Sequence, residues 1–233
     1  MPDPHLELTD WRRRVAATWA QWRAASAGSP PAAALATVAF REAKDELFRD
    51  HPQTPLPVEA RGAAFEGLSY WPYDPDLRLV ARFEPAPALE PEGPATAKLA
   101  TLPSSGGEAM AVRPIGRVAL SGPLAGTRLS VFWMEGYGGG LFLPFRDATS
   151  GDETYGAGRY LLDTIKGADQ GADPASGELL LDFNMAYFPS CAYDPRWACP
   201  LAPPENRLPV PVRVGERLPG RDSRTIESHA EEP

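Results

Sequence analysis

The spacing of apolar residues changes once along this chain, near residue 60, and no other feature constrains the fold as strongly. Before that point apolar residues recur at steps of three and four, which is the period of an amphipathic helix. From about Ala63 onwards they alternate with polar residues, as at Leu77, Leu79 and Phe83. Alternation is typical of a β-strand with one buried face. We therefore expect helices first and a sheet after them.

The helical part is predicted to be a hairpin formed by residues 1–58. Its first helix carries a stripe of tryptophans, is expected to be capped by Thr9 or Asp10, and should end before Gly28. The second helix is expected from about Ala33 to Arg49, because Pro52 follows. The tryptophan stripe could pack on the rest of the protein or dock another chain, and helical spacing favours packing.

Residues 59–218 are predicted to form a mainly β domain, so that the whole chain is α+β. The 27 prolines and 21 glycines favour short strands joined by irregular loops. Such a pattern is typical of an antiparallel barrel or sandwich. Residues after Phe183 are expected to form an ordered, irregular strap, and residues 219–233 a disordered tail. Strands are expected at about 77–83, 96–102, 109–120, 127–134, 140–145, 159–164 and 178–183.

Charge and composition exclude several classes of function. The net charge of -8 would repel the phosphates of nucleic acid. No apolar run is long enough to span a membrane, and the N-terminus lacks the pattern of a secretory signal. We therefore expect a cytoplasmic protein, in which Cys191 and Cys199 would remain thiols unless they pair. A homo-oligomer remains open.

Common catalytic and cofactor motifs are missing from the sequence. The only histidines are His5, His51 and His229, which is too few for a metal centre or a Ser-His-Asp triad. The glycine run from Gly136 to Gly140 leads into a strand, so a hairpin turn is a better interpretation than a phosphate loop. We predict no metal and no cofactor.

A dense set of polar and aromatic residues lies between Phe145 and Asn206, and it predicts a pocket for a small molecule. In a regular strand Arg159 and Asp163 would share one face, and Asp182 and Asn184 would share another. Arginines favour a ligand with a carboxylate or phosphate. The predicted pocket is lined by Arg146, Tyr155, Arg159, Tyr160, Asp182, Asn184 and Tyr187.

Two other interpretations of the same residues remain open. In one, the protein is a histidine-independent enzyme, for example a hydrolase, that acts on a small anionic substrate. Asp182 would be the general base or Tyr155 the acid, and an arginine would stabilise charge. In the other, the polar residues only bond to each other and hold the fold together. Cys191 is interpreted as a buried structural thiol rather than a nucleophile, because no histidine base is evident.

Several long motifs resemble an uncharacterised bacterial and archaeal family, DUF1684. They are FRDATSGDETYGAGRYL from Phe145, DFNMAYFPSCAY from Asp182 and CPLAPPENRL from Cys199. REAKDELF from Arg41 and FEGLSY from Phe65 extend the similarity to nearly the whole chain except its two ends. Phe188 departs from the pattern, where the resemblance implies a small polar residue. Because the family has no assigned activity, the resemblance implies no function.

Overall fold

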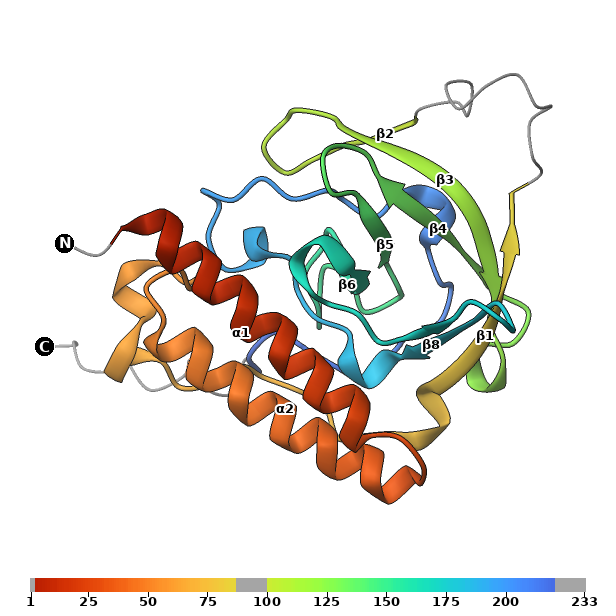
Figure 1. Ribbon diagram of the computed structural model, residues 1–233, viewed down its shortest axis with the longest axis horizontal. Helices are drawn as coiled ribbons and strands as arrows, with labels where there is room; N and C mark the ends of the chain where they lie inside the picture. Colours follow the sequence, from red (N-terminus) through yellow and green to blue (C-terminus); the bar gives the residue numbers. More distant parts are fainter. Residues whose placement is uncertain (1–2, 87–99, 221–233) are drawn as a thin grey trace, which may run out of the picture.

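Two long helices begin the chain in the computed structural model, which describes residues 3–86 and 100–220 (Figure 1). They are α1 (Pro4–Ala25) and α2 (Pro30–Asp50), packed against each other. The predicted caps of α1 are wrong: the carboxylate of Asp3 caps the helix, and the Thr9 hydroxyl donates back to the His5 carbonyl within it. Pro4 explains the early start, because proline fits the first position of a helix.

The strands that follow the helices form one curled antiparallel sheet, a half-barrel, which confirms the predicted fold class. Its strand order is β6-β5-β4-β3-β1-β8-β7, with β2 paired to β3. β7 escaped prediction because two residues are too short to show alternation, and residues 96–99 of one expected strand lie outside the described residues. The strands are β1 (Arg78–Pro85), β2 (Ala100–Leu102), β3 (Met110–Ala119), β4 (Arg128–Met134), β5 (Gly140–Phe145), β6 (Arg159–Asp163), β7 (Ala172–Asp173) and β8 (Glu178–Asp182).

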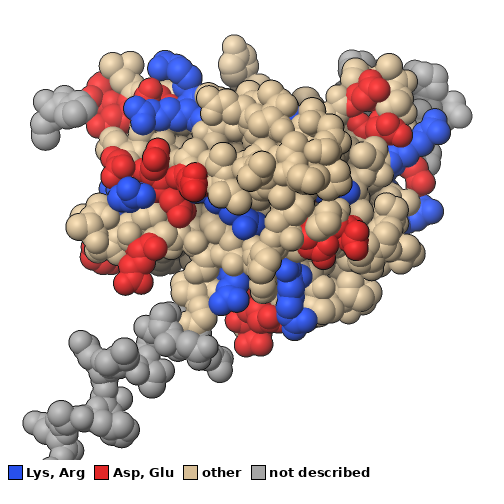
Figure 2. Space-filling view, turned by 90° about the horizontal axis from the view of Figure 1, so that it is seen from below, with Lys and Arg blue, Asp and Glu red and all other residues tan. Residues whose placement is uncertain are grey.

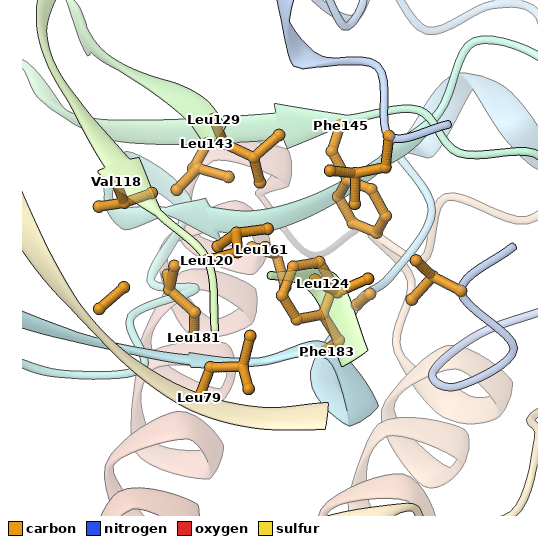
Figure 3. Close-up of a cluster of buried hydrophobic side chains, with 14 of the residues drawn as sticks. Leu79, Val118, Leu120, Leu124, Leu129, Leu143, Phe145, Leu161, Leu181 and Phe183 are labelled. Atoms are coloured by element: carbon orange, nitrogen blue, oxygen red, sulfur yellow. The ribbon is translucent and has the colours of Figure 1, made fainter. Parts of the chain in front are cut away.

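The main core fills the inside of the half-barrel (Figure 3). Leucine, valine and phenylalanine side chains from β1, β3, β4, β5, β6 and β8 point toward one another there. As predicted, Leu179, Leu181 and Phe183 share the inward face. Leu208, Val212 and Val214 of the C-terminal segment complete this core, so the strap covers the open side of the curled sheet.

Side-chain amides connect parts of the half-barrel that no strand pairing joins. The Gln170 amide donates to the Leu161 carbonyl at 3.0 Å and accepts from the Asp182 amide at 2.6 Å. It thereby bridges β6 and β8, which are not neighbours in the strand order. Asn206 likewise exchanges hydrogen bonds with both backbone groups of Ser130 and fixes the strap to β4.

The helical hairpin lies against the outside of the half-barrel. Trp19 and Trp22 are buried in a second cluster with Ala168 and Met185, so the tryptophan stripe packs on the same chain. The division of the chain at residues 58 and 218 stays a prediction, and most of the expected tail, residues 221–233, lies outside the described residues. None of the described helices combines the length and apolar character that a membrane span requires.

Candidate functional site

Arg159, the centre of the predicted pocket, is buried in a network of its own chain. One of its nitrogens donates to the Asp147 carboxylate at 2.6 Å, and Asp147 is also almost completely buried. The same guanidinium donates to the carbonyls of Val212, Val214 and Glu216 in the strap. Arg159 therefore holds the strap in place, and its donors already have partners.

Asp182 and Asn184 lie together, as expected, but they bond to each other and to their own chain. One oxygen of Asp182 accepts from both the backbone and the side-chain nitrogen of Asn184, at 3.0 and 2.8 Å. The other oxygen accepts from Arg78 at 2.7 Å. Burial raises the pKa of Asp182, while the Arg78 guanidinium and the Asn184 amide act in the opposite direction.

Arg146 and Tyr155 form a third, separate group. The Arg146 guanidinium donates to the Gly156 carbonyl at 2.8 Å. Tyr155 lies beside Phe188 and Cys191, and burial together with the Cys191 thiol raises its pKa to about 12. The ring of Phe188 fills the position where a small polar residue was expected, and it is buried.

Two of the seven predicted residues, Tyr160 and Tyr187, line one cavity together. The Tyr160 hydroxyl donates to the Pro200 carbonyl, and the two tyrosine rings meet edge to face with centroids 5.8 Å apart. The cavity, of about 110 Å³, lies between the helical hairpin, β6 and the strap. The structure therefore distributes the other five residues over three hydrogen-bonded groups away from this cavity.

Aromatic rings form most of the wall of this cavity. Trp19 contacts Phe40 and Tyr187 with centroids 4.7 and 6.3 Å apart, and Phe48 contacts Tyr193 at 5.3 Å. Helices supply half of the rings and β6 and the strap the other half. The eight aromatic residues that line the cavity are Trp11, Trp19, Phe40, Phe48, Tyr160, Tyr187, Phe188 and Tyr193.

A β-bulge in β6 places Asp163 at the cavity. Tyr160 and Leu162 pair with consecutive residues of β5, so Leu161 is the extra residue. Leu161 and Leu162 both point into the main core, and the alternation shifts by one residue after them. Asp163 consequently faces the cavity beside Tyr160, and the prediction that it shares a face with Arg159 is wrong.

Asp163 and Lys166 form a polar edge on this cavity. Both residues lie in a turn that is closed by two hydrogen bonds between the backbones of Asp163 and Ala168, at 2.9 and 3.0 Å. Burial raises the pKa of Asp163, and the ammonium of Lys166, 3.9 Å away, opposes that shift. The Lys166 side chain is 54% exposed and therefore keeps a cation accessible at the edge of an apolar site.

A second lysine enters the cavity from α2. The ammonium of Lys44 bonds to the Glu216 carboxylate at 3.0 Å and lies 5.2 and 5.3 Å from the ring centres of Phe48 and Tyr187. The same carboxylate accepts from the Tyr193 hydroxyl and from the Phe188 amide. This buried network joins α2 to the strap behind the rings.

Local sequence patterns do not predict that these polar residues meet at one cavity. Lys44, Asp163 and Lys166 come from α2, β6 and the turn that follows β6, and their local patterns are those of ordinary surface residues. Among the described residues no group of three or more His, Cys, Asp or Glu is arranged to hold a metal ion. On the face shown in Figure 2, acidic and basic side chains are interspersed and form no continuous basic surface.

The comparisons with known proteins place the chain in a family without a known function. One solved structure that it resembles is the NMR structure of the uncharacterized protein from gene locus rrnAC0354 of Haloarcula marismortui, which is 32% identical. The match covers 78% of this chain and 91% of the archaeal one, with a TM-score of 0.55. No curated protein matches. A family model described as "Protein of unknown function (DUF1684)" matches residues 63–217. Since the match spans well over half of the sequence, the chain belongs to the DUF1684 family.

Proposed function

We propose that this protein binds a small molecule with a flat apolar body and an acidic group, in the cavity between the helical hairpin and the half-barrel. The observation that carries the proposal is the wall of eight aromatic residues with two lysines beside it. The body would lie between the rings, and its carboxylate or phosphate would face Lys166. The anionic ligand expected from the sequence is thus assigned to lysines rather than to Arg146 and Arg159.

The size of the cavity supports a body of about one aromatic ring. An apolar cavity of about 150 Å³ binds benzene. This cavity, with about 110 Å³, is smaller and therefore holds at most one ring, while the remainder of the ligand extends to the edge. Rings prefer edge-to-face or offset contacts, and the walls offer both orientations.

The charges at the cavity support an acid rather than a cation. Aromatic walls also attract cations. Here, however, the ammonium of Lys44 already lies within 5.3 Å of two ring centres and would repel a second cation. Lys166 is the more accessible lysine, because Lys44 is 12% exposed and bonded to Glu216.

Matched probes test the proposal: phenylacetate, phenylacetamide and phenethylamine, which differ in charge but share a ring. We expect phenylacetate to bind best and phenethylamine worst in titration calorimetry. Lys166→Gln should lower the preference for phenylacetate over phenylacetamide about tenfold, which corresponds to ~1.4 kcal/mol. Exposed Arg82→Gln on β1 is the control and should leave the preference unchanged.

Filling the cavity tests its location. Thr18 lines the cavity from α1, so Thr18→Phe should abolish binding of all three probes. Ala20→Phe, at an exposed position of the same helix, should not. Equal binding by Thr18→Phe and wild type, or no binding of any probe at millimolar concentration, would contradict the proposal.

Asp163 favours a second candidate function, the histidine-independent enzyme. A buried carboxyl that lines a cavity and has a raised pKa is suited to proton transfer, whereas Asp182 is completely buried and bonded to Arg78. Asp163 would replace Asp182 and Tyr155 as the acid or base. If wild type hydrolyses phenyl esters, and Asp163→Asn still binds phenylacetate but no longer hydrolyses these esters, the result would support an enzyme. No turnover by wild type would count against it.

We also propose a cytoplasmic location, which the two free thiols Cys191 and Cys199 support.

A further inference from the structure

Cys191 and Cys199 lie next to each other within the strap, and neither lines the cavity described above. The Cys191 amide donates to the Cys199 sulfur at 3.4 Å, and both cysteines are free and buried. The Cys199 amide donates to the Ser105 hydroxyl oxygen at 3.0 Å, and that hydroxyl donates to the Trp197 carbonyl. The two ends of the segment from Cys191 to Cys199 are therefore held together before any covalent bond joins them.

The surroundings give the two sulfurs different protonation. The Cys199 thiol donates to Cys191 and lowers the pKa of Cys191 to about 6, against the effect of burial, and the hydroxyls of Ser105 and Tyr155 act in the same direction as the Cys199 thiol. The same interaction with Cys191, together with burial, raises the pKa of Cys199. These shifts favour the thiolate at Cys191 and the thiol at Cys199, and the thiolate is the reactive form of cysteine.

Exposure also distinguishes the two sulfurs. Cys191 is 8% exposed and Cys199 is 1% exposed, so Cys191 is the more accessible residue of the pair. The sequence contains only these two cysteines, so no third thiol of the chain competes to form the disulfide.

We propose that Cys191 and Cys199 are a redox-active pair, in which a hydroperoxide oxidises Cys191 and Cys199 resolves the product to a disulfide. The Cys191 thiolate attacks the terminal oxygen of the hydroperoxide, the O–O bond breaks, and the leaving alkoxide takes a proton from water. Cys191 is now a sulfenic acid. The Cys199 sulfur then attacks the Cys191 sulfur, the S–S bond forms, and the hydroxyl leaves as water with the thiol proton of Cys199. Two electrons pass from the two sulfurs to the peroxide, and a dithiol can then reduce the disulfide back to two thiols by exchange.

The pair differs from a structural disulfide in that both sulfurs are reduced in the folded protein. The proposal does not depend on ligand binding in the cavity. The pair is nevertheless close to the cavity along the chain. Ser190 lines the cavity, and Cys191 is the next residue in the turn η7 (Ser190–Ala192).

The experiment treats the reduced, full-length protein with hydrogen peroxide and then blocks the remaining thiols with an alkylating reagent. Mass spectrometry of wild type should show an unalkylated monomer that has lost two hydrogen atoms, and a peptide that links Cys191 to Cys199. Cys199→Ser should accumulate sulfenic acid at Cys191, detected as a dimedone adduct. Cys191→Ser should keep a reduced Cys199 under the same conditions.

The pH dependence and one positioning residue add an independent readout. The oxidation rate of wild type should rise with pH through about 6, as the Cys191 thiolate forms. Tyr155→Phe removes a hydroxyl donor and should shift that midpoint upwards, while Tyr137→Phe, at a fully exposed tyrosine, should not. If wild type keeps two alkylatable thiols after excess peroxide, the proposal is overturned. A disulfide only between two chains, or equal reactivity of the two single-cysteine variants, would overturn it as well. Wild type alone decides the first two outcomes, so they do not depend on the variants being folded.

Discussion

At the scale of single residues, Asp163 is the clearest example of a buried acid at the candidate site, where its carboxylate also accepts from the Lys166 amide at 3.3 Å and caps the turn after β6. Its carboxylate is 6% exposed at the edge of an aromatic cavity, and its nearest cation is 3.9 Å away. Burial disfavours the charged form, so the pKa of Asp163 is raised. Groups that reduce stability in a cavity are typical of functional sites.

This position makes a prediction about stability and pH. Because the folded-state pKa of Asp163 lies above the unfolded value, the folded state holds its proton more tightly, and stability falls as pH rises through that interval. Asp163→Asn removes the effect. Its free energy of unfolding in urea, relative to wild type, should therefore increase as the pH rises above about 4. Exposed Asp76→Asn should show no such trend, and a relative stability of Asp163→Asn that decreases with pH would contradict the assignment.

Arg159 shows what residue types alone could and could not predict. The sequence predicted that Arg159 would share a face of this strand with Asp163. Its partner is Asp147, twelve positions earlier, rather than Asp163, four positions later. The difference follows from the bulge at Leu161, and the residue types of β6 do not predict this bulge.

At the scale of elements, the Gln170 side chain connects β6 and β8, which do not pair with each other in the sheet. Its amide bonds to the Leu161 carbonyl, the Asp182 carbonyl and the Asp182 amide, and the residue is 1% exposed. Strands and turns were predictable here because alternation, proline and glycine are local features. The closure between β6 and β8 was not predictable, because it depends on one side chain in a loop.

Gln170→Ala should therefore destabilise the protein by about 2 to 3 kcal/mol, since it leaves buried backbone groups of both strands without partners. Denaturant unfolding measures the loss. Gln21→Ala, at an exposed position of α1, is the control and should change stability by less than about 0.5 kcal/mol. Equal losses in the two variants would show that β6 and β8 do not need this bridge.

At the scale of the whole molecule, the candidate site is formed where three parts of the chain meet. α1 and α2 supply one wall, β6 a second, and the strap a third. The sequence predicted each part separately, including the helical hairpin and the irregular strap. It could not predict the cavity, because the contacts of Lys44 with Glu216 and of Trp19 with Tyr187 join segments more than a hundred residues apart.

The six tryptophans allow this central claim to be tested in one measurement. Trp11 and Trp19 line the cavity, whereas Trp22, Trp71, Trp133 and Trp197 do not. Their indole N–H groups give separate NMR signals, which can be followed while phenylacetate is added to the protein labelled with nitrogen-15. The account predicts the largest shifts for Trp11 and Trp19 and saturation at both with one dissociation constant. Largest shifts at Trp71, Trp133 or Trp197, or no shift at Trp19 when the probe is saturating, would contradict it.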